Sequence, residues 1–222
     1  MHSSFVAWGM LELGTKVLLG YLLGSLNGSL FLGRILGGPD IRTVGSGNAG
    51  GTNALRARGK WFALGVMVID VGKGYIAAAL LPGVDLGLGA PGIAVHWLPL
   101  ACGAAAVVGH CYPIWFDFAG GKGAATAVGT LGALAPGLLL PALAVWLLVA
   151  TTTGFVGLST MAAALVLPAY VALVAWPAEV PLLVFLVLLA GFIIYTHRGN
   201  VVRMLRRQEN RMTGLMLLRR PR

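Results

Sequence analysis

Three short polar segments contain most of the side chains in this sequence that are suited to chemistry. The first runs from Asp40 to Arg56 and combines glycines with small hydrogen-bonding side chains. Such a loop presents backbone N–H groups to an anion, and an arginine grips phosphate oxygens with two parallel hydrogen bonds. The segment therefore predicts a phosphate-binding loop with the candidate residues Asp40, Arg42, Gly45, Ser46, Gly47, Asn48, Gly50, Thr52, Asn53 and Arg56.

Part of this loop also fits a motif of a different kind of protein. Gly45 to Gly50 matches the G-x-G-x-x-G fingerprint of dinucleotide binding, and Asp70 stands near its acidic position. That fingerprint requires a strand before it and a parallel sheet around it. Here a predicted membrane helix precedes the loop, so the sequence does not predict a nucleotide cofactor.

The second polar segment joins His110 to a glycine-rich stretch at the start of a short apolar helix. A helix N-terminus has unpaired N–H donors and a partial positive charge, so glycines beside a lysine form a second phosphate seat. The stretch is not a Walker A loop, because its first glycine is missing and Gly123 replaces the magnesium-binding Ser or Thr. The candidate residues are His110, Gly120, Gly121, Lys122, Gly123 and Thr126.

The third polar segment follows the last apolar stretch and contains His197, Asn200, Arg203 and Glu209. His197 and Asn200 are three residues apart, so on a helix they share one face. Either side chain can donate a hydrogen bond to a phosphate, and His197 can also transfer protons.

Each segment also has an ordinary structural explanation. Glycine loops between membrane helices are often turns, lysines often extend to the membrane interface, and histidines often cap carbonyls. The occurrence of all three polar segments in one chain favours a functional role over these structural explanations. Asp70 and Lys73 lie three residues apart within an apolar stretch, so we expect them to pair and either support the pocket or touch the ligand.

The composition predicts an integral membrane protein. Of the 222 residues, 58% are hydrophobic and 10% are charged, whereas a soluble domain carries roughly 25% charged residues. Four long apolar stretches predict transmembrane helices: Val17 to Phe31, Trp61 to Leu81, Gly92 to Val108 and Val180 to Tyr195. Because Glu12 and Lys16 precede the first stretch and no cleavage site follows it, we interpret it as a span rather than a signal peptide.

The distribution of basic residues predicts the topology. Of the sixteen Lys and Arg residues, fifteen fall in Arg34 to Lys60, Lys73, Lys122 and Arg198 to the C-terminus, and the positive-inside rule places these segments in the cytoplasm. Four spans fit between Lys122 and His197 if breaks occur near Pro136, Thr151 to Gly157 and Trp176 to Pro181. The expected fold is a single all-α domain over residues 1–222, with seven transmembrane helices, the N-terminus outside and the C-terminus cytoplasmic.

The shortest expected span is Gly123 to Leu134, about 18 Å long at 1.5 Å per residue. It is too short for a hydrocarbon core of about 30 Å, so its N-terminus should line a polar pocket below the membrane surface. The basic tail from Arg203 to Arg222 is either a solvated extension or an amphipathic segment on the anionic inner leaflet.

On these residues the chain resembles the acyl-phosphate-dependent glycerol-3-phosphate acyltransferase family of small bacterial membrane enzymes, known as PlsY. The likeness runs from Gly24 to Glu209. The family has three motifs, which resemble Asp40 to Asn53, then Gly109-His110 with Gly120 to Thr126, and then His197 to Asn200 with Arg203 and Glu209.

The resemblance implies transfer of a fatty acyl group from acyl phosphate to the 1-hydroxyl of sn-glycerol 3-phosphate. It assigns Ser46, Thr52, Arg56, Lys122, His197 and Asn200 to the substrate phosphates and the reacting carbonyl, and Gly120, Gly121 and Gly123 to acyl phosphate. It implies a bacterial inner-membrane enzyme with its site facing the cytoplasm and a functional contact with the enzyme that produces acyl phosphate. No metal, cofactor or nucleic-acid partner is expected.

Some positions depart from the family. Asn27 stands where the family usually has proline, and Gly154 and Gly157 occupy a loop where the family tends to place arginine and serine side chains. Two other functions stay open at this point. A transporter for phosphate or a phosphate ester would place its binding groups near the midplane, and an inactive membrane scaffold would not need the basic residues.

Overall fold

The computed structural model describes residues 2–89, 96–175 and 179–217, and their regular structure is helical throughout. The chain divides by its internal contacts into two compact units, Met1–Leu134 and Ala135–Arg222. The first contains the first two polar segments of the sequence, and the second contains the third.

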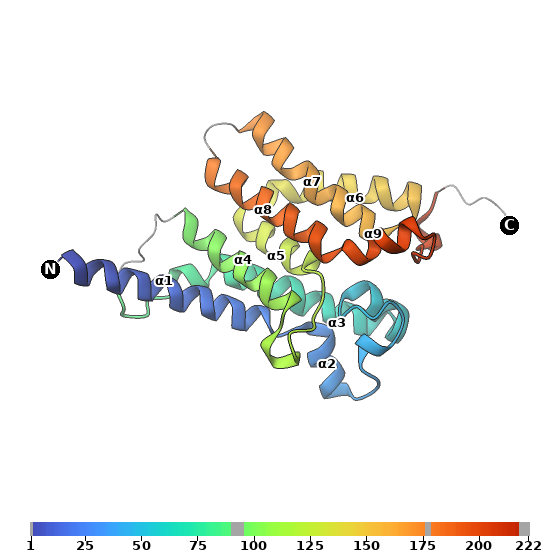
Figure 1. The fold of residues 1–222 in the computed structure, drawn as a ribbon, viewed down its shortest axis with the longest axis horizontal. Coiled ribbons are helices and arrows are strands. Elements are labelled where there is room, and N and C mark those ends of the chain that lie inside the picture. Colours follow the sequence, from blue (N-terminus) through green and yellow to red (C-terminus); the bar gives the residue numbers. More distant parts are fainter. Residues whose placement is uncertain (1, 90–95, 176–178, 218–222) are drawn as a thin grey trace. The chain divides into compact units, whose positions relative to one another are not determined.

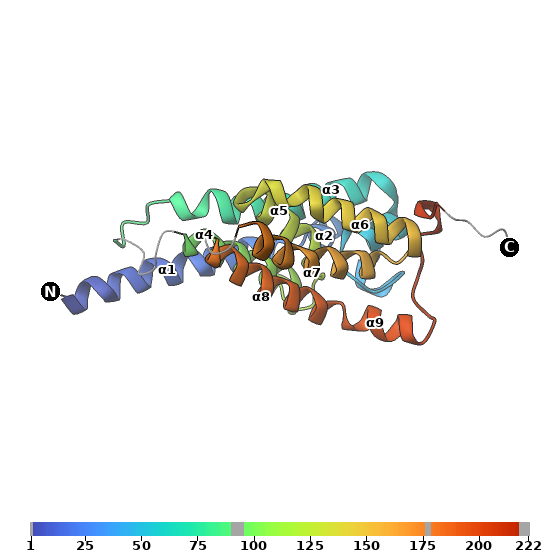
Figure 2. The ribbon, with the colours of Figure 1, turned by 90° about the horizontal axis from the view of Figure 1, so that it is seen from above.

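The first unit consists of five α-helices (Figure 1): α1 (His2–Gly24), α2 (Gly28–Leu36), α3 (Gly51–Ala79), α4 (Trp97–Cys111) and α5 (Ala124–Leu134). Helix α3 packs against α4 and α5, and α1 packs along α4. Figure 2 shows α5 lying along α3. This packing brings the loop before α3 and the loop before α5 to the same end of the unit.

Glycine allows α3 and α5 to approach closely. A methyl group at Gly74 of α3 would overlap the backbone carbonyl of Thr126, and one at Gly129 of α5 would overlap that of Val71. Small residues at such contacts are typical of helix packing in lipid, where close van der Waals contact drives association. The glycine content of the sequence thus contributes directly to the packing that positions the two loops.

Helix α1 and helix α2 are separated by a break at Ser25, Leu26 and Asn27, with a bend of 51° between the helices. The expectation of one continuous helix from Val17 to Phe31 was therefore wrong in its bounds. Asn27 caps α2 through its side chain, and this local hydrogen bond competes with continuation of the helix. The sequence signal was present as Ser25, Asn27 and Gly28 inside an apolar run.

Two charged side chains of α3 satisfy the backbone groups that this break exposes. The ammonium of Lys73 donates to the carbonyl of Leu26 at 3.1 Å, and the N–H of Gly28 donates to Asp70 Oδ1 at 3.0 Å. Backbone groups without partners are costly inside a membrane. The predicted pairing of Asp70 and Lys73 is confirmed, at 2.8 Å, and it supports a broken helix.

Glu12 and Lys16 lie inside α1 rather than before the first span, which corrects a second boundary. Both are buried, and Lys16 Nζ lies 2.7 Å from Glu12 Oε1. Lys16 also donates to the carbonyl of Pro82 at 2.9 Å. The pair allows two charges to be buried one helical turn apart.

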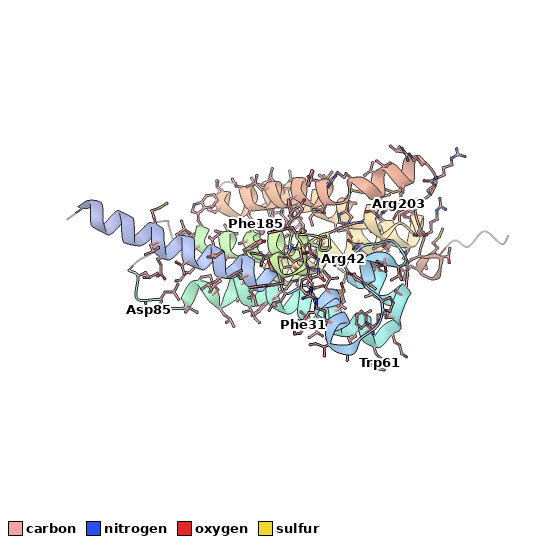
Figure 3. All side chains as sticks on the ribbon, turned by 60° about the horizontal axis from the view of Figure 1, so that its bottom comes forward. Phe31, Arg42, Trp61, Asp85, Phe185 and Arg203 are labelled. Carbon is pink, nitrogen blue, oxygen red and sulfur yellow. The ribbon has the colours of Figure 1, made fainter. Side chains whose placement is uncertain are left out.

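Helix α3 has a kink at Gly59, whose φ of 81° is in the left-handed region. Before the kink lies a short helical stretch that carries Thr52 and Arg56, and after it the helix continues to Ala79. This second part agrees with the span expected from Trp61 to Leu81. In Figure 3, Asp85 lies at the opposite end of the first unit from Arg42 and Trp61.

The second unit contains α6 (Leu139–Thr153), α7 (Val156–Val174), α8 (Val180–Thr196) and α9 (Arg198–Leu205). Helix α7 packs against α6 and α8. The breaks expected near Pro136 and Thr151 to Gly157 occur as predicted, and residues 176–178 of the third lie outside the described residues. The tail returns to the α6–α7 turn, where Met212 N–H donates to Gly154 O at 2.8 Å.

Four helical segments of the described chain are long and apolar enough to cross a membrane, and the number rises to six if each bent pair is one span. The bent pairs are α1 with α2 and α8 with α9. Helix α5 is a shorter apolar helix and begins at Ala124, next to the expected start at Gly123. The count of seven spans and the direction of the termini stay predictions.

Candidate active site

The loop before α3 is organised by Asn53, which is 1% exposed. Its Nδ2 donates to the carbonyls of Ile41 and Val44 at 3.0 and 2.9 Å, and its Oδ1 accepts from the N–H of Ser46 at 2.9 Å. Gly45 adopts a φ of 60°, and a methyl group there would overlap Asn53 Oδ1. The amide of Asn53 therefore shapes the loop from within.

The N-terminus of α3 is open. Its cap residue is Gly50, and no side chain caps the helix. The first-turn N–H groups of a helix have no intrahelical acceptor and carry a partial positive charge. Thr52 lies in this turn and is half-buried, and Arg56 lies one turn further and is exposed. This end of α3 has the donors and the charge that a phosphate requires.

The loop before α5 is fixed to the end of α4 by its own backbone. Gly120 N–H donates to Cys111 O and Gly121 N–H donates to His110 O, both at 3.1 Å. A methyl group at Gly121 would overlap His110 Nε2. Gly123 has a φ of 86° and leads into α5, where Ala127 N–H donates to Gly123 O. Lys122 is half-buried and Thr126 is buried.

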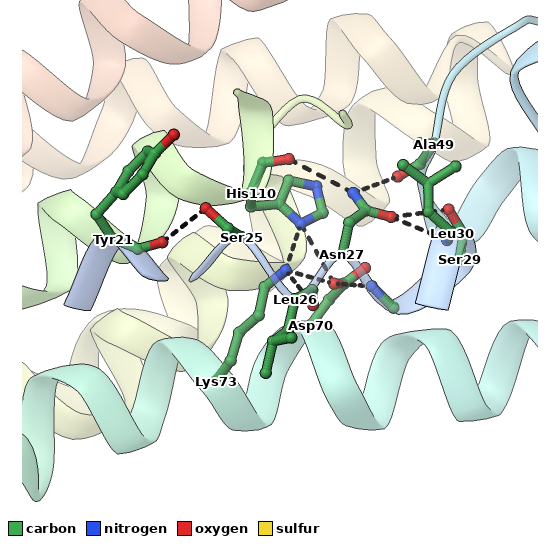
Figure 4. Close-up of polar contacts among 11 residues, drawn as sticks. Tyr21, Ser25, Leu26, Asn27, Ser29, Leu30, Ala49, Asp70, Lys73 and His110 are labelled. Carbon is green, nitrogen blue, oxygen red and sulfur yellow. Dashed lines mark hydrogen bonds and ion pairs between the residues drawn. The ribbon is translucent and has the colours of Figure 1, made fainter. Parts of the chain in front are cut away.

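Two side chains connect these loops to each other. Arg42 Nη1 donates to the carbonyls of Phe116 and Ala119 at 3.0 and 3.2 Å, while its other nitrogens bind Asp40. Asn27 Nδ2 donates to Ala49 O at 3.1 Å and to His110 O at 3.4 Å (Figure 4). The first two polar segments of the sequence thus form one continuous structure.

Asp40 is held as a carboxylate by its arginine partner. Hydrogen bonds from Arg42 lower the pKa of the Asp40 carboxyl below its ordinary value of 3.8. Asp40 also caps the turn Ile41–Thr43 by accepting from Arg42 N–H at 2.9 Å. The pair lies at the edge of the loop, where it fixes the direction in which Arg42 reaches the second loop.

His110 belongs to a buried polar cluster with Asp70 and Lys73. Its Nδ1 lies 3.2 Å from Asp70 Oδ1 and 3.0 Å from Lys73 Nζ. The three side chains are 0–3% exposed. They bond to one another and to the broken backbone at Leu26 and Gly28. Of the two roles that the sequence left open for Asp70 and Lys73, this geometry favours support of the site.

The third polar segment forms a cluster of its own in the second unit. Asn200 Nδ2 donates to Glu209 Oε1 and Arg203 Nε donates to Glu209 Oε2, both at 2.7 Å. His197 lies at the junction of α8 and α9, is 5% exposed, and its Nδ1 lies 2.8 Å from Ile193 O. Asn200 packs against Gly157, where a methyl group would lie 2.8 Å from Asn200 Nδ2 and the amide would have to shift.

Asn27 is the site residue that the sequence reasoning missed. It was noted only as a departure from proline, yet it is fully buried and contacts the two glycine loops. An amide within an apolar run was the available signal, since a buried amide needs hydrogen-bond partners. Its partners lie 22 and 83 residues away in the chain, which no local pattern could identify.

Within residues 2–89, 96–175 and 179–217 no group of three or more His, Cys, Asp or Glu side chains is placed to hold a metal ion. The donors around the two glycine loops are N–H groups, amides, hydroxyls and cations. Such a set suits anionic oxygen atoms rather than a cation.

The glycerol-3-phosphate acyltransferase family model matches residues 15–207. The chain belongs to this family.

Relatives and solved structures agree with this assignment. A glycerol-3-phosphate acyltransferase of Rhodospirillum rubrum is 42% identical over 202 residues, 91% of this chain and 92% of the relative. One from Azotobacter vinelandii is 44% identical over 83% of this chain and 91% of the relative. A crystal structure of PlsY, an integral membrane glycerol 3-phosphate acyltransferase in its glycerol 3-phosphate form, is 33% identical with a TM-score of 0.79, covering 91% of this chain and 96% of that one.

Membership of this family shows what kind of protein the helices form. This chain is an integral membrane protein with apolar helices and the helical fold of PlsY. The resemblance stated from the three motifs is confirmed, and the family match over residues 15–207 contains all of their residues except Glu209.

Proposed function

We propose that this chain transfers a fatty acyl group from acyl phosphate to the 1-hydroxyl of sn-glycerol 3-phosphate. The products are lysophosphatidic acid and inorganic phosphate, and the reaction is the first acylation of phospholipid synthesis. The acyl chain enters from lipid between apolar helices, while both phosphate groups bind at the polar end of the bundle. No metal or cofactor takes part.

The observation that carries the proposal is the meeting of two glycine loops, each of which leads into a helix N-terminus. Gly121 N–H bonds to His110 O, and Ala49 O lies against Gly121 closely enough that a methyl group there would be 2.7 Å away. Two anion seats in contact suit a reaction in which both substrates carry a phosphate. They also bring the attacking hydroxyl and the acyl carbonyl together, which lowers the entropic part of the barrier.

Each loop has a basic residue for its phosphate. Arg56 is exposed on the first turns of α3 and binds one substrate phosphate together with Ser46 and Thr52. Lys122, with Gly120, Gly121 and Gly123, binds acyl phosphate at the start of α5. Gly47, Asn48, Gly50 and Thr126 complete the lining. That His197, Asn200 and Arg203 also bind substrate stays a prediction from the sequence.

The chemical step moves one acyl group and one proton. The 1-hydroxyl oxygen attacks the acyl carbonyl carbon, the bond from that carbon to the phosphate oxygen breaks, and phosphate leaves with the electron pair. Preorganised donors stabilise the negative charge that builds up on the carbonyl oxygen. The hydroxyl proton passes to a substrate phosphate or to His197, which must be neutral to accept it.

The proposal includes the cellular location and the membrane topology of the enzyme. The basic segments lie on the cytoplasmic side of the bacterial inner membrane, the bundle has seven spans, and the N-terminus lies outside. Helix α5, with 11 residues, begins within the bilayer and its N-terminus faces the substrate phosphates. A cytoplasmic site also permits functional contact with the enzyme that produces acyl phosphate.

One assay tests the proposal. Purified protein is mixed with palmitoyl phosphate and glycerol 3-phosphate, and both lysophosphatidic acid and released phosphate are measured. Equal amounts of the two products are expected, and palmitoyl-CoA should be a poor donor. Binding or transport of glycerol 3-phosphate without either product would contradict the proposal and favour a transporter.

A further inference from the structure

The side chain of Asn27 makes hydrogen bonds in two directions from the break between α1 and α2 (Figure 4). Its Oδ1 accepts from the N–H of Leu30 at 3.3 Å and from the hydroxyl of Ser29 at 3.0 Å, which caps α2. Its Nδ2 donates to the carbonyls of Ala49 and His110. Because Asn27 is 0% exposed, water does not compete for these donors.

The two carbonyls belong to the two glycine loops. Ala49 precedes Gly50, the cap of α3. His110 O accepts from Gly121 N–H at 3.1 Å as well as from Asn27. A primary amide has two N–H groups, and here one is available for each carbonyl. The amide nitrogen of Asn27 is therefore a direct link between the base of one loop and the anchor of the other.

Capping alone does not require an asparagine at this position. Ser, Thr and Asp cap helices about as well, because one side-chain oxygen is sufficient. A hydroxyl that caps the helix has no further N–H groups to donate to the two carbonyls. An ionised carboxylate has no donor at all and would place an acceptor against them. The amide of Asn27 satisfies the cap and both carbonyls at once, and removing its donors would leave buried acceptors unsatisfied.

We propose that Asn27 is a positioning residue, whose Nδ2 sets the separation of the two phosphate-binding loops. The change in kcat expected when this residue is replaced rests on the acyl transfer proposed above, whereas the hydrogen-bonded link between the loops does not. Each loop keeps its own internal hydrogen bonds without Asn27, through Asn53 in the first and Gly120 and Gly121 in the second. Arg42 still joins the first loop to Phe116 and Ala119. Loss of the Asn27 link therefore changes the separation of two intact seats at Ala49 and His110, where Nδ2 binds.

This predicts a specific kinetic pattern. Each substrate still finds its own loop, so each KM stays within about threefold of the wild-type value, whereas kcat falls about tenfold because the reacting groups are misaligned. A residue that only capped α2 would change the amount of folded enzyme and leave kcat per folded molecule unchanged.

Two variants separate the link from the cap. Asn27→Ser keeps an oxygen that can cap α2 and loses both bonds to the loops. Ser29→Ala is the matched control, because it removes one bond to Asn27 Oδ1 and leaves both loop bonds in place. Both are compared with wild type for kcat and KM with palmitoyl phosphate and glycerol 3-phosphate.

Hydrogen–deuterium exchange on the same proteins in nanodiscs gives a readout that needs no catalysis. In Asn27→Ser the amides of residues 45–53 and 120–124 should exchange faster together, and in Ser29→Ala they should match wild type. Faster exchange confined to residues 28–31, or wild-type kcat for Asn27→Ser, would overturn the proposal. If Asn27→Ser does not fold, Asn27→Asp, which keeps the shape and the cap, is tested by the same criteria.

The failures of the two proposals are distinguishable. If wild type forms no lysophosphatidic acid but the loops of Asn27→Ser exchange faster together, acyl transfer is wrong and the link holds. If wild type is active and Asn27→Ser equals Ser29→Ala in kcat and in exchange, acyl transfer holds and the link is wrong.

Discussion

The ammonium of Lys73 lies 3.1 Å from the carbonyl oxygen of Leu26, at the point where α1 stops being a helix. The same ammonium lies 2.8 Å from Asp70, whose Oδ1 accepts from Gly28 N–H on the other side of the break. A charged pair on one helix thus completes the hydrogen bonding of an interruption in another. The interruption in turn places Asn27 against the two glycine loops.

Lys73→Met should destabilise the protein by about 3 kcal/mol or more, because it leaves Asp70 charged and buried without its partner. The double variant Asp70→Asn/Lys73→Met removes both charges and should recover part of the loss. Thermal unfolding in detergent measures both. A single variant as stable as wild type would show that the pair does not hold the break.

Gly121→Ala should lower kcat/KM for acyl transfer about a hundredfold, because the new methyl group displaces the loop from His110 and Ala49. Gly72→Ala is the matched control, since a methyl group there meets nothing within 4 Å. The assay is steady-state formation of lysophosphatidic acid by both variants. Equal activities of the two variants would contradict the close approach of the loops.

Arg56→Ala should lower kcat/KM by about a hundred- to a thousandfold while leaving the melting temperature close to that of wild type, since the side chain is exposed. Lys60→Ala, an exposed cation just beyond the kink at Gly59, should retain activity within about twofold. The kcat/KM of Arg56→Lys should fall between those of the two alanine variants, because lysine keeps the positive charge but cannot make the two parallel hydrogen bonds of a guanidinium. Normal turnover by purified Arg56→Ala would remove this residue from the site.

The contribution of Asp40 to stability should depend on pH with a defined sign. Because Arg42 lowers the pKa of Asp40 in the folded protein, the contribution is fully present above the ordinary value of 3.8 and is lost as pH falls through the lowered pKa. The difference in melting temperature between wild type and Asp40→Asn should be constant from neutral pH to about pH 5 and then shrink on further acidification. A difference that grew in acid would contradict the assignment.

Much of this arrangement follows from local sequence. The start of α5 beside Gly123, the pairing of Asp70 with Lys73 three residues away, and the breaks near Pro136 and Gly154 all depend on neighbours in the chain. The phosphate loops are recognisable because glycines and small polar residues have few other reasons to gather between apolar helices.

The remaining features depend on contacts between distant residues. The break after Gly24 looked like part of an apolar run, and the polar atoms that stabilise it come from Asp70 and Lys73 of another helix. Glu12 and Lys16 looked like a polar flank of the first span. They are instead a buried ion pair, and the lysine also donates to the carbonyl of Pro82, 66 residues away in the chain. Hydrophobic patterning reports apolar faces and carries no information about which buried polar atoms meet.

The central claim is that the three polar segments all lie on the cytoplasmic face of the membrane. Single cysteines at the exposed positions Thr43 and Arg198, within the first and third motifs, and Ala119, next to the second, test it in a background where the buried Cys102 and Cys111 are replaced by alanine. A membrane-impermeant maleimide should label all three in inverted membrane vesicles and none in intact spheroplasts. Labelling of any one of them from the spheroplast exterior would contradict the account.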